Sequence, residues 1–460
     1  MKIEPRVEVF TGEHVSPQVL LTPLPDTLAA EIVDYLRQEA HRYLDIDADR
    51  SLEFADRIIA IGKVRNDADQ TALGWMARGN ALRLLGKMEE AWQTLEYAGN
   101  IFEAAGNKIG WAETRIGQLY LAMKLSRVKE TLLDGKEAQK ILKRAGKYEL
   151  LVRLNTARCA VYGSLGRLHR SIRLLTSTLA VAKKLGTPSQ QHLVGILEMN
   201  LGVDHEELGD YSQALAYFER AQSIFAVENE TRNIALVELN ISYIAQAQSR
   251  YRHSLRLLHN ILERGVDQFP MEYLAVKRDM TECYLRLNRY AEARQMAQEA
   301  VSGYRTRNTA YEIARSLMHL GTAEAELGNY PSAYSALEEA ENIFVSLEAT
   351  SWQAIVRLRS ARIAMKQKNI AEAYQEAVVA AADFESGGQH VNYAAALLIK
   401  GQALLALEDF KLAFQAANQA LSIAQRYNIA SLRYSCHLLL GQIAEARQKT
   451  GRAIRRYQAA

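Results

Sequence analysis

The chain has 460 residues, of which 48% are hydrophobic and 24% are charged, and its formal net charge is +3. One globular core is not expected at this length, because single cores stop growing near about 250–300 residues, whereas a stacked array of repeats escapes that limit. The small net charge gives no reason by itself to expect a polyanionic partner. Seven prolines favour long uninterrupted helices, and no apolar run approaches the roughly 18 residues of a membrane-spanning helix.

The cysteines and the N-terminal composition bear on the compartment. Cys159, Cys283 and Cys436 are far apart and odd in number, which argues against a disulfide framework and indicates a reducing environment. The N-terminal segment contains Glu4 and Glu8 and lacks the apolar core of a signal peptide. We therefore expect a cytoplasmic protein of bacterial type.

Taken in chain order, residues 1–24 are predicted to be an irregular lead-in, and residues 25–460 a helical repeat array whose last repeat is incomplete. Apolar residues recur at helical spacing along the array. In the helix expected from position 211, one face carries Tyr211, Ala214, Leu215, Phe218, Ala221, Ile224 and Phe225. A loop insertion is expected at residues 187–189, where the spacing between turns lengthens around Pro188.

The same short pattern returns about every 40 residues, which is typical of a stacked array. A small residue is followed seven positions later by a turn residue, two later by an aromatic residue and three later by another small residue. Clear copies begin at Gly202, Ser242, Thr281, Gly321 and Gly401. Turns within helix pairs are predicted near residues 46, 86, 126, 166, 209, 249, 288, 328, 368, 408 and 448. Eleven turns predict an all-α, right-handed α-solenoid, a superhelix of about eleven antiparallel helix pairs.

Small and large side chains alternate along the array in a way that suits close packing. The small residue of each first helix lets the second helix approach, and alanines answer it at Ala91, Ala214, Ala293, Ala333, Ala373 and Ala413. Another alanine follows seven residues later in each copy. Four residues after that comes a large side chain, at Phe102, Phe225, Tyr304, Phe344 and Phe384.

These positions resemble the tetratricopeptide repeat family over about residues 26–460. The phrases RGNALRLLGKMEEAW and NLGVDHEELGDYSQALAYFERA carry the resemblance. Three features depart from the family: the period exceeds the usual 34 or so, the proline that commonly ends the motif is missing, and Thr131 and Ser171 replace the usual alanine. The resemblance implies a surface for binding proteins or peptides.

Long repeats of this kind also resemble the sensor arrays of two groups of bacterial signalling proteins. In CHAT proteins the array is fused to a caspase-like protease domain, and in others to a STAND-type regulatory ATPase. The lead-in before the first repeat favours the CHAT group. No protease residue can be assigned, because the sequence ends at Ala460 within a repeat, so a catalytic domain would lie beyond residue 460.

In the family the first helices line a concave groove, and the resemblance places a set of polar residues there. This predicted binding set is Asn80, Arg83, Asn200, Glu206, Asn240, Tyr243, Gln246, His319, Arg359, Arg362 and Gln402. The apolar residues three positions before the small residue, among them Met76, Leu239, Met318 and Leu358, are predicted to line the groove as well. The family's carboxylate clamp is not matched, because Met76 stands where a lysine would.

The pair Asn200 and Asn240 occupies the same position in successive repeats. Each side-chain amide both donates and accepts hydrogen bonds, so the pair could hold an extended peptide backbone. The alternative is that these amides bond across adjacent helices, and the sequence does not decide between the two.

Charge is distributed unevenly along the chain. Residues 121–190 contain fifteen Lys and Arg against four Asp and Glu, whereas residues 316–356 contain six acidic residues and no Lys or Arg. A basic patch is predicted from Lys140, Lys143, Arg144, Arg167, Arg170 and Arg173. It is either a footprint for an acidic partner or an ordinary solvated surface, partly favoured by a helix dipole. Few aromatic residues interleave with it, which argues against nucleic acid.

The sequence lacks the motifs that would carry chemistry. No GxxxxGK[ST] phosphate loop, HExxH or paired CxxC occurs, so we expect no cofactor and no metal site. His205 beside Glu206 and Glu207 comes nearest to a metal cluster, but sequential neighbours point to different faces of a helix. Cys159 occupies the small-residue position of its repeat, where packing explains it better than catalysis.

Together these observations predict a non-enzymatic scaffold that binds a protein or peptide, as the sensor or interaction region of a bacterial signalling or defence protein. Two alternatives stay open. One is the N-terminal part of a CHAT-type protease, and the other is a regulator that responds to a short signalling peptide.

Overall fold

The computed structural model describes residues 25–44, 47–123, 125, 127–185, 191–427 and 429–460. The predicted lead-in at 1–24 and the predicted loop insertion at 187–189 lie outside the described residues. The contacts between Cα atoms divide the chain into two compact units, Met1–Asn240 (unit 1) and Ile241–Ala460 (unit 2). Each unit is described by itself.

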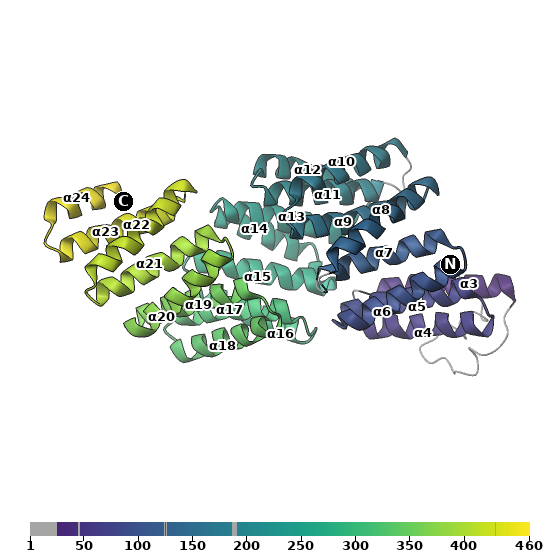
Figure 1. Cartoon of the computed structure of the whole chain (residues 1–460), viewed down its shortest axis with the longest axis horizontal. Helices are drawn as coiled ribbons and strands as arrows, with labels where there is room; N and C mark the ends of the chain where they lie inside the picture. The colour runs from purple at the N-terminus through teal and green to yellow at the C-terminus, as the bar shows by residue number, and fades with distance from the viewer. Residues whose placement is uncertain (1–24, 45–46, 124, 126, 186–190, 428) are drawn as a thin grey trace. The chain divides into compact units, whose positions relative to one another are not determined.

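The described residues form α-helices joined by short connections, with one 3-10 turn and no strand (Figure 1). Unit 1 contains α3 (Asp26–Tyr43), α4 (Ala48–Val64), α5 (Ala68–Leu84), α6 (Met88–Ala104), α7 (Lys108–Ala122), α8 (Val128–Arg144), α9 (Tyr148–Ser164), α10 (Leu168–Leu185), α11 (Gln191–Glu207) and α12 (Tyr211–Val227). The boundary between the units falls within α13 (Thr231–Ala247).

Unit 2 continues with α14 (Tyr251–Glu263), η2 (Val266–Gln268), α15 (Pro270–Arg286), α16 (Tyr290–Arg305), α17 (Ala310–Glu326), α18 (Tyr330–Ser346), α19 (Thr350–Lys366), α20 (Ile370–Ser386), α21 (His390–Ala406), α22 (Phe410–Arg426), α23 (Ala430–Ala446) and α24 (Thr450–Ala459). Helices that follow each other along the chain pack side by side, as α4 does with α5 and α17 with α18. In the described part of the chain, the helices make eleven pairs, from α3 with α4 to α23 with α24, so the predicted all-α array of helix pairs is confirmed.

The period of 40 residues follows from the helix lengths. Most helices, such as α17 and α18, have 17 residues, and the connections between them are three residues long. The residue at the centre of most connections has positive φ, as at Gly209 (φ 77°) and Gly328 (φ 83°). There the backbone turns back on the preceding helix: Gly209 N–H donates to Glu206 O at 2.8 Å and Asp210 N–H to His205 O at 2.9 Å. The turns predicted near 86, 166, 209, 249, 288, 328, 368, 408 and 448 lie at these left-handed residues.

The helix starts are closed by side chains as well as by packing. Asp67, Asp210 and Asp409 each accept a hydrogen bond from the backbone N–H three residues on, which satisfies one of the free donors of the first turn. The compact turn and the cap together set the angle at which the next helix leaves. That angle repeats from pair to pair and positions the first helices beside one another.

The predicted core alternation is confirmed. The alanines predicted to answer the small residue are fully buried, and so are Phe102, Phe225, Phe344 and Phe384. The close approach is tight: a Cβ on Gly202 would lie 2.5 Å from the Phe218 ring. Thr131 and Ser171, which replace alanine, are buried in the same position. Small and large side chains thus fill each interface between neighbouring helices at the density of a protein interior.

Candidate functional site

The first helices of consecutive pairs contact one another directly. In unit 1, α5 packs on α3 and on α7, and α7 on α9; in unit 2, α17 packs on α15 and on α19, and α21 on α19 and on α23. Within the described residues, no comparable contact joins consecutive second helices. The first helices therefore form the tightly spaced inner face of each unit, and the second helices form the outer face.

Polar side chains on the inner face of unit 2 meet across neighbouring helices in a regular register. Counting from the small residue of each first helix, the side chain at position +1 meets the side chain at position −2 of the next first helix. Glu282 of α15 and His319 of α17 make one such contact, with Oε2 and Nδ1 3.3 Å apart. Thr322 and Arg359 make the next, where Nη1 of Arg359 donates to Oγ1 of Thr322 at 2.5 Å. We call these contacts rungs.

The contact between Glu282 and His319 lies among charged groups that set the protonation states of both residues. Arg286 donates from Nε to Oε1 of Glu282 at 2.7 Å, one turn further along α15. Burial opposes ionisation of Glu282, but His319, Arg286 and Arg359 hold its pKa below the usual range. Burial lowers the pKa of His319, with Arg359 and Arg315 acting in the same direction against Glu282. Glu282 is therefore an anion and His319 is neutral at pH 7.

The rungs stop where the facing residue is apolar. Arg362 stands at position +1 of α19, but position −2 of α21 is Ile399, which is buried in the core. Gln402 stands at position +1 of α21, and the facing Leu439 of α23 is also buried. Neither Arg362 nor Gln402 has a hydrogen-bond or ion-pair partner among the residues that the structure describes. Their polar groups are therefore available to a ligand.

Unit 1 has the same register with its rungs open. Asn200 stands at position −2 of α11 and Asn240 at position −2 of α13, and the residues at position +1 of the preceding first helices are the apolar Ala160 and Val203. Both asparagines are half-buried, and neither amide makes a hydrogen bond within the described structure. Of the two readings of this pair, bonding of the amides to each other across adjacent helices is not observed.

A pocket of about 400 Å³ lies on the inner face of unit 1, lined by residues of α3, α4, α5, α7 and α9. Asn80 of α5 borders it, and its amide has no hydrogen bond to the described residues. A Cβ on Gly117 would come within 2.7 Å of the Asn80 side-chain oxygen, so α7 needs glycine there to leave Asn80 its place. Across the pocket, Arg153 lies 3.9 Å from Glu113. The pocket thus offers an amide together with charges of both signs.

Other residues of the predicted binding set are held locally or are exposed. The Arg83 guanidinium lies over the Tyr120 ring, 5.2 Å from its centroid. Gln246 donates to Ser242 on its own helix at 3.4 Å. Tyr243 is exposed on α13. Asn80, Asn200, Glu206, Asn240, Arg362 and Gln402 are the members for which the described structure shows no hydrogen-bond partner, whereas His319 and Arg359 are held in rungs.

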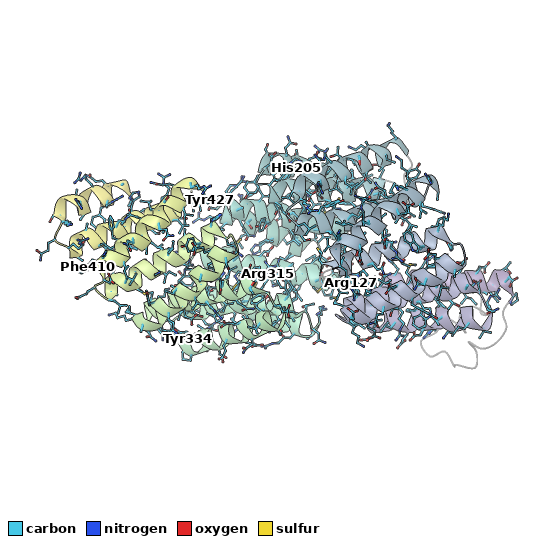
Figure 2. All side chains as sticks on the ribbon, viewed as in Figure 1. Arg127, His205, Arg315, Tyr334, Phe410 and Tyr427 are labelled. Carbon is cyan, nitrogen blue, oxygen red and sulfur yellow. The ribbon has the colours of Figure 1, made fainter. Side chains whose placement is uncertain are left out.

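Glu206 lies on α11 next to a second buried carboxylate. Burial and the neighbouring Glu207 raise the pKa of Glu206 from 4.5 to about 7. Burial likewise raises the pKa of Asp204 to about 6, against a hydrogen bond from Ser171. Between them in sequence, His205 stacks on Tyr217 with ring centroids 5.2 Å apart (Figure 2). Glu206 thus changes its charge close to neutral pH.

The apolar residues predicted at position −3 mostly belong to the core. Leu239, Met318 and Leu358 are buried, whereas Met76, which is also buried, lines the pocket of unit 1. Met318 and Leu358 join the hydrophobic clusters between successive pairs. At this position the side chain points into the interface with the neighbouring helices and not away from it.

The predicted basic patch lies apart from the inner face. Lys140, Lys143 and Arg144 are exposed on α8, a second helix, and Lys140 is paired with Glu137 at 2.9 Å. Arg170 and Arg173 are exposed on α10, the next second helix, and Arg167 is exposed just before it. These residues therefore belong to the outer face of unit 1.

Hollows on the outer face are bridged by ion pairs. One of about 540 Å³ contains Glu198, whose buried carboxylate accepts from Lys183 of α10 and Arg220 of α12. Another, of about 720 Å³, contains Arg305 of α16 and Glu339 of α18, with both carboxylate oxygens within 2.7 Å of Nη2. The charged groups named here already have protein partners. Their ion pairs join neighbouring helices across these hollows.

Sequence reasoning missed Glu282, Arg286 and the pocket-lining pair Glu113 and Arg153. Glu282 was within reach, since it occupies position +1 of α15 just as Tyr243 does on α13. The pocket was not, because its side chains come from first helices whose contacts are not visible in the repeat pattern.

The described residues show no sign of a catalytic cysteine. Cys159, Cys283 and Cys436 are buried and free. Burial raises the pKa of the first two thiols to about 12 and that of the third to about 11, so each stays protonated at neutral pH. In the described part of the chain, His, Cys, Asp and Glu side chains do not gather in threes that could hold a metal ion.

None of the helices that the structure describes combines the length and the apolar character of a membrane span.

The fold and the repeat pattern define a tetratricopeptide-like repeat array. Residues 199–226 match the family model for the tetratricopeptide repeat. No curated protein matches the chain. The apo form of the quorum sensor NprR from B. thuringiensis is similar in structure, with a TM-score of 0.52 and 12% identity over 85% of this chain and 99% of that one.

Two further solved structures share lower similarity. One is a STAND signal-transduction ATPase with a tetratricopeptide repeat sensor from Pyrococcus horikoshii, with a TM-score of 0.49 and 12% identity over 98% of this chain and 68% of that one. The other is a Rap protein complexed with the competence and sporulation factor, with a TM-score of 0.48 and 15% identity over 75% of this chain and 95% of that one. At such identities the likeness concerns the fold.

Proposed function

We propose that this protein is a non-enzymatic array that binds a peptide or protein segment along its inner face. The carrying observation is the pair of amides on successive first helices, Asn200 and Asn240, which are half-buried and have no hydrogen-bond partner in the described structure. A side-chain amide can donate to a backbone carbonyl and accept from a backbone N–H at once. Two amides at one register position suit the regular polar groups of an extended chain.

The pocket of unit 1 and the open groups of unit 2 support the same reading. Asn80 adds a third free amide, and Arg362 and Gln402 add polar groups where rungs are missing. Leaving such groups without partners costs stability unless water or a ligand satisfies them. A surface that keeps them at repeated positions is better explained by binding than by packing.

A display library of random short peptides, selected against the whole protein, tests this proposal. We expect selected peptides to bind the wild type and to bind the double variant Asn200→Ala, Asn240→Ala roughly tenfold or more weakly, because each lost amide removes hydrogen bonds to the peptide. The melting temperature of the variant should not change. The control is Asn100→Ala, an exposed amide of α6 on the outer face of unit 1, which should bind like the wild type.

Two results would contradict the proposal. If the double variant and the wild type bind selected peptides equally, the amides do not form the site. If the variant loses binding and stability together, the amides are structural.

The biological setting is part of the proposal. A sensor or interaction region of a bacterial signalling or defence protein in the cytoplasm fits an array with three free cysteines. A regulator that responds to a signalling peptide fits the inner-face site, and its fold is shared with a quorum sensor. Attachment to a CHAT-type protease domain is the alternative. Sequencing the gene beyond codon 460 would distinguish these, since a reading frame with a His and a Cys in an α/β pattern favours the protease.

The outer basic patch of unit 1 is proposed as a second contact for an acidic protein surface. Its exposed cations include Lys143, Arg144 and Arg170. Exposed charges are screened within about 8–10 Å at physiological salt. Affinity for a captured partner should therefore fall steeply as salt rises, and fall less for a variant with these three residues changed to Gln. A flat salt response would remove the patch from the site.

A further inference from the structure

Three guanidinium groups gather on the inner face of unit 2. Arg359 and Arg362 stand three residues apart on α19 and so share one face of that helix, while Arg286 of α15 pairs with the carboxylate that also contacts His319 of α17. Burial lowers the pKa of Arg359 to about 10 against Glu282, and the charges of Arg362 and Arg286 act in the same direction as burial. One carboxylate, Glu282, lies at bonding distance from Arg286. The cluster therefore carries more positive than negative charge.

The two arginines of α19 differ in how they are held. Arg359 donates from Nη1 to Thr322, so its guanidinium is held in the rung. Arg362 is exposed and faces Ile399, and within the described structure nothing accepts from it. A fixed guanidinium beside a free one forms a fork of donors that needs little reordering to bind an oxyanion.

The charge balance favours a doubly charged ligand group. With three arginines, one ionised Glu282 and a neutral His319, the cluster has a formal charge of +2. A single carboxylate would leave one cation uncompensated. A phosphoryl group carries about −1.5 to −2 at pH 7 and offers three acceptor oxygens. Guanidinium forks bind such groups through two parallel hydrogen bonds.

We infer that the Arg286–Arg359–Arg362 cluster on α15 and α19 binds a phosphoryl group, carried as a phosphorylated side chain by the segment that occupies the inner face. Arg362 makes the direct contact, and Arg359, held by Thr322, makes the second. Arg286 keeps Glu282 away from the anion. This inference rests on the proposed function for its physiological ligand, but the site itself can be tested without a peptide.

The test titrates the whole protein with phenyl phosphate and, separately, with phenylacetate as a matched carboxylate. We expect saturable binding of phenyl phosphate, weaker binding of phenylacetate, and a loss of roughly tenfold or more for phenyl phosphate in Arg362→Gln. Because Arg362 is exposed and has no partner in the described structure, this variant should fold normally. Arg256→Gln is the control, since Arg256 is exposed on α14, a second helix, and has no partner in the described structure.

Three outcomes would overturn the inference. One is the absence of saturable phenyl phosphate binding. Another is equal binding of phenyl phosphate and phenylacetate, which would make the cluster a carboxylate site. The third is an equal loss in Arg256→Gln, which would show that only the general charge of unit 2 matters.

The two proposals fail separately. The double variant at Asn200 and Asn240 should keep full phenyl phosphate binding, since those residues belong to unit 1. If phenyl phosphate binds through Arg362 while selected peptides ignore the asparagines, the peptide proposal fails and the anion site stands. If the asparagines matter for peptides and phenyl phosphate does not bind, the reverse holds. A peptide with phosphoserine, compared with its unmodified form, then tests whether a peptide ligand uses the anion site of unit 2.

Discussion

The inner faces of the two units use one register for opposite purposes. In unit 2, Glu282 meets His319 and Thr322 meets Arg359, so polar groups are paired within the protein. In unit 1, Asn200 and Asn240 stand at position −2, the residues at position +1 of the preceding first helices are Ala160 and Val203, and the two amides have no partner in the described structure. At the same register position, a polar side chain is therefore either paired with a residue of the neighbouring first helix or left without a partner. The residue type one repeat away decides which.

The difference extends to ionisation. Glu282 lies among cations that hold its pKa low despite burial, whereas burial beside Glu207 raises the pKa of Glu206 to about 7. Protonation of Glu282 should therefore destabilise the fold, whereas protonation of Glu206 should stabilise it. Partners across the helix interface, and not burial alone, decide which carboxylate stabilises the fold at neutral pH.

The largest expected effect tests whether the two units have separate hydrophobic cores. Phe225 of unit 1 and Phe344 of unit 2 are fully buried, and the latter stacks on Trp352 at 5.6 Å. Phe225→Ala and Phe344→Ala should each lower the free energy of unfolding of their surroundings by about 3–5 kcal/mol. Hydrogen exchange should show lost amide protection around the changed residue. Equal loss throughout the chain from either change would mean that the units unfold as one.

Removing the anion of the closed rung is the next largest effect. Glu282→Gln leaves Arg286 and Arg359 without their carboxylate, which should cost about 2–3 kcal/mol in urea unfolding. The matched control is Glu292→Gln, because Glu292 pairs with Arg289 on an exposed turn of α16, where solvent screens the charges and loss of the pair should cost much less. If both changes cost the same, the rung adds nothing beyond an ordinary surface pair.

The corresponding change in unit 1 should have the opposite sign. Because the folded protein holds a proton on Glu206 up to about pH 7 while the usual value is 4.5, the folded state binds more protons between these values. The stability that Glu206 contributes is therefore full below about pH 4.5 and is lost as the pH rises through 7. Glu206→Gln should unfold like the wild type at pH 4 and be about 1–2 kcal/mol more stable at pH 8.

Urea unfolding at several pH values checks this prediction. Glu219→Gln, on an exposed position of α12, is the control and should show no pH-dependent gain. A variant at Glu206 that is less stable than the wild type at pH 8 would mean that its ionised carboxylate has a stabilising partner.

The sequence predicts more of the fold than of the site, for a physical reason. Turns and cores depend on residue types that are visible locally, such as Gly209 with its positive φ and Gly202 against Phe218. Rungs depend on pairs such as Thr322 and Arg359, which are 37 residues apart and join only once the helix spacing is known. The same holds for burial of Glu206, since its residue type gives no sign of a raised pKa.

The smallest effect is expected from a substitution that offers the Asn240 amide a partner within the protein. Val203→Thr preserves shape and places a hydroxyl at the position that faces Asn240, so the Asn240 amide gains an internal partner. We expect a change in stability of less than about 1 kcal/mol and a fall of a few-fold in affinity for selected peptides, because the peptide must displace the new hydrogen bond. Val227→Thr, on the exposed end of α12, should change neither quantity. Unaltered peptide affinity in Val203→Thr would show that the register observed in unit 2 does not continue between α11 and α13.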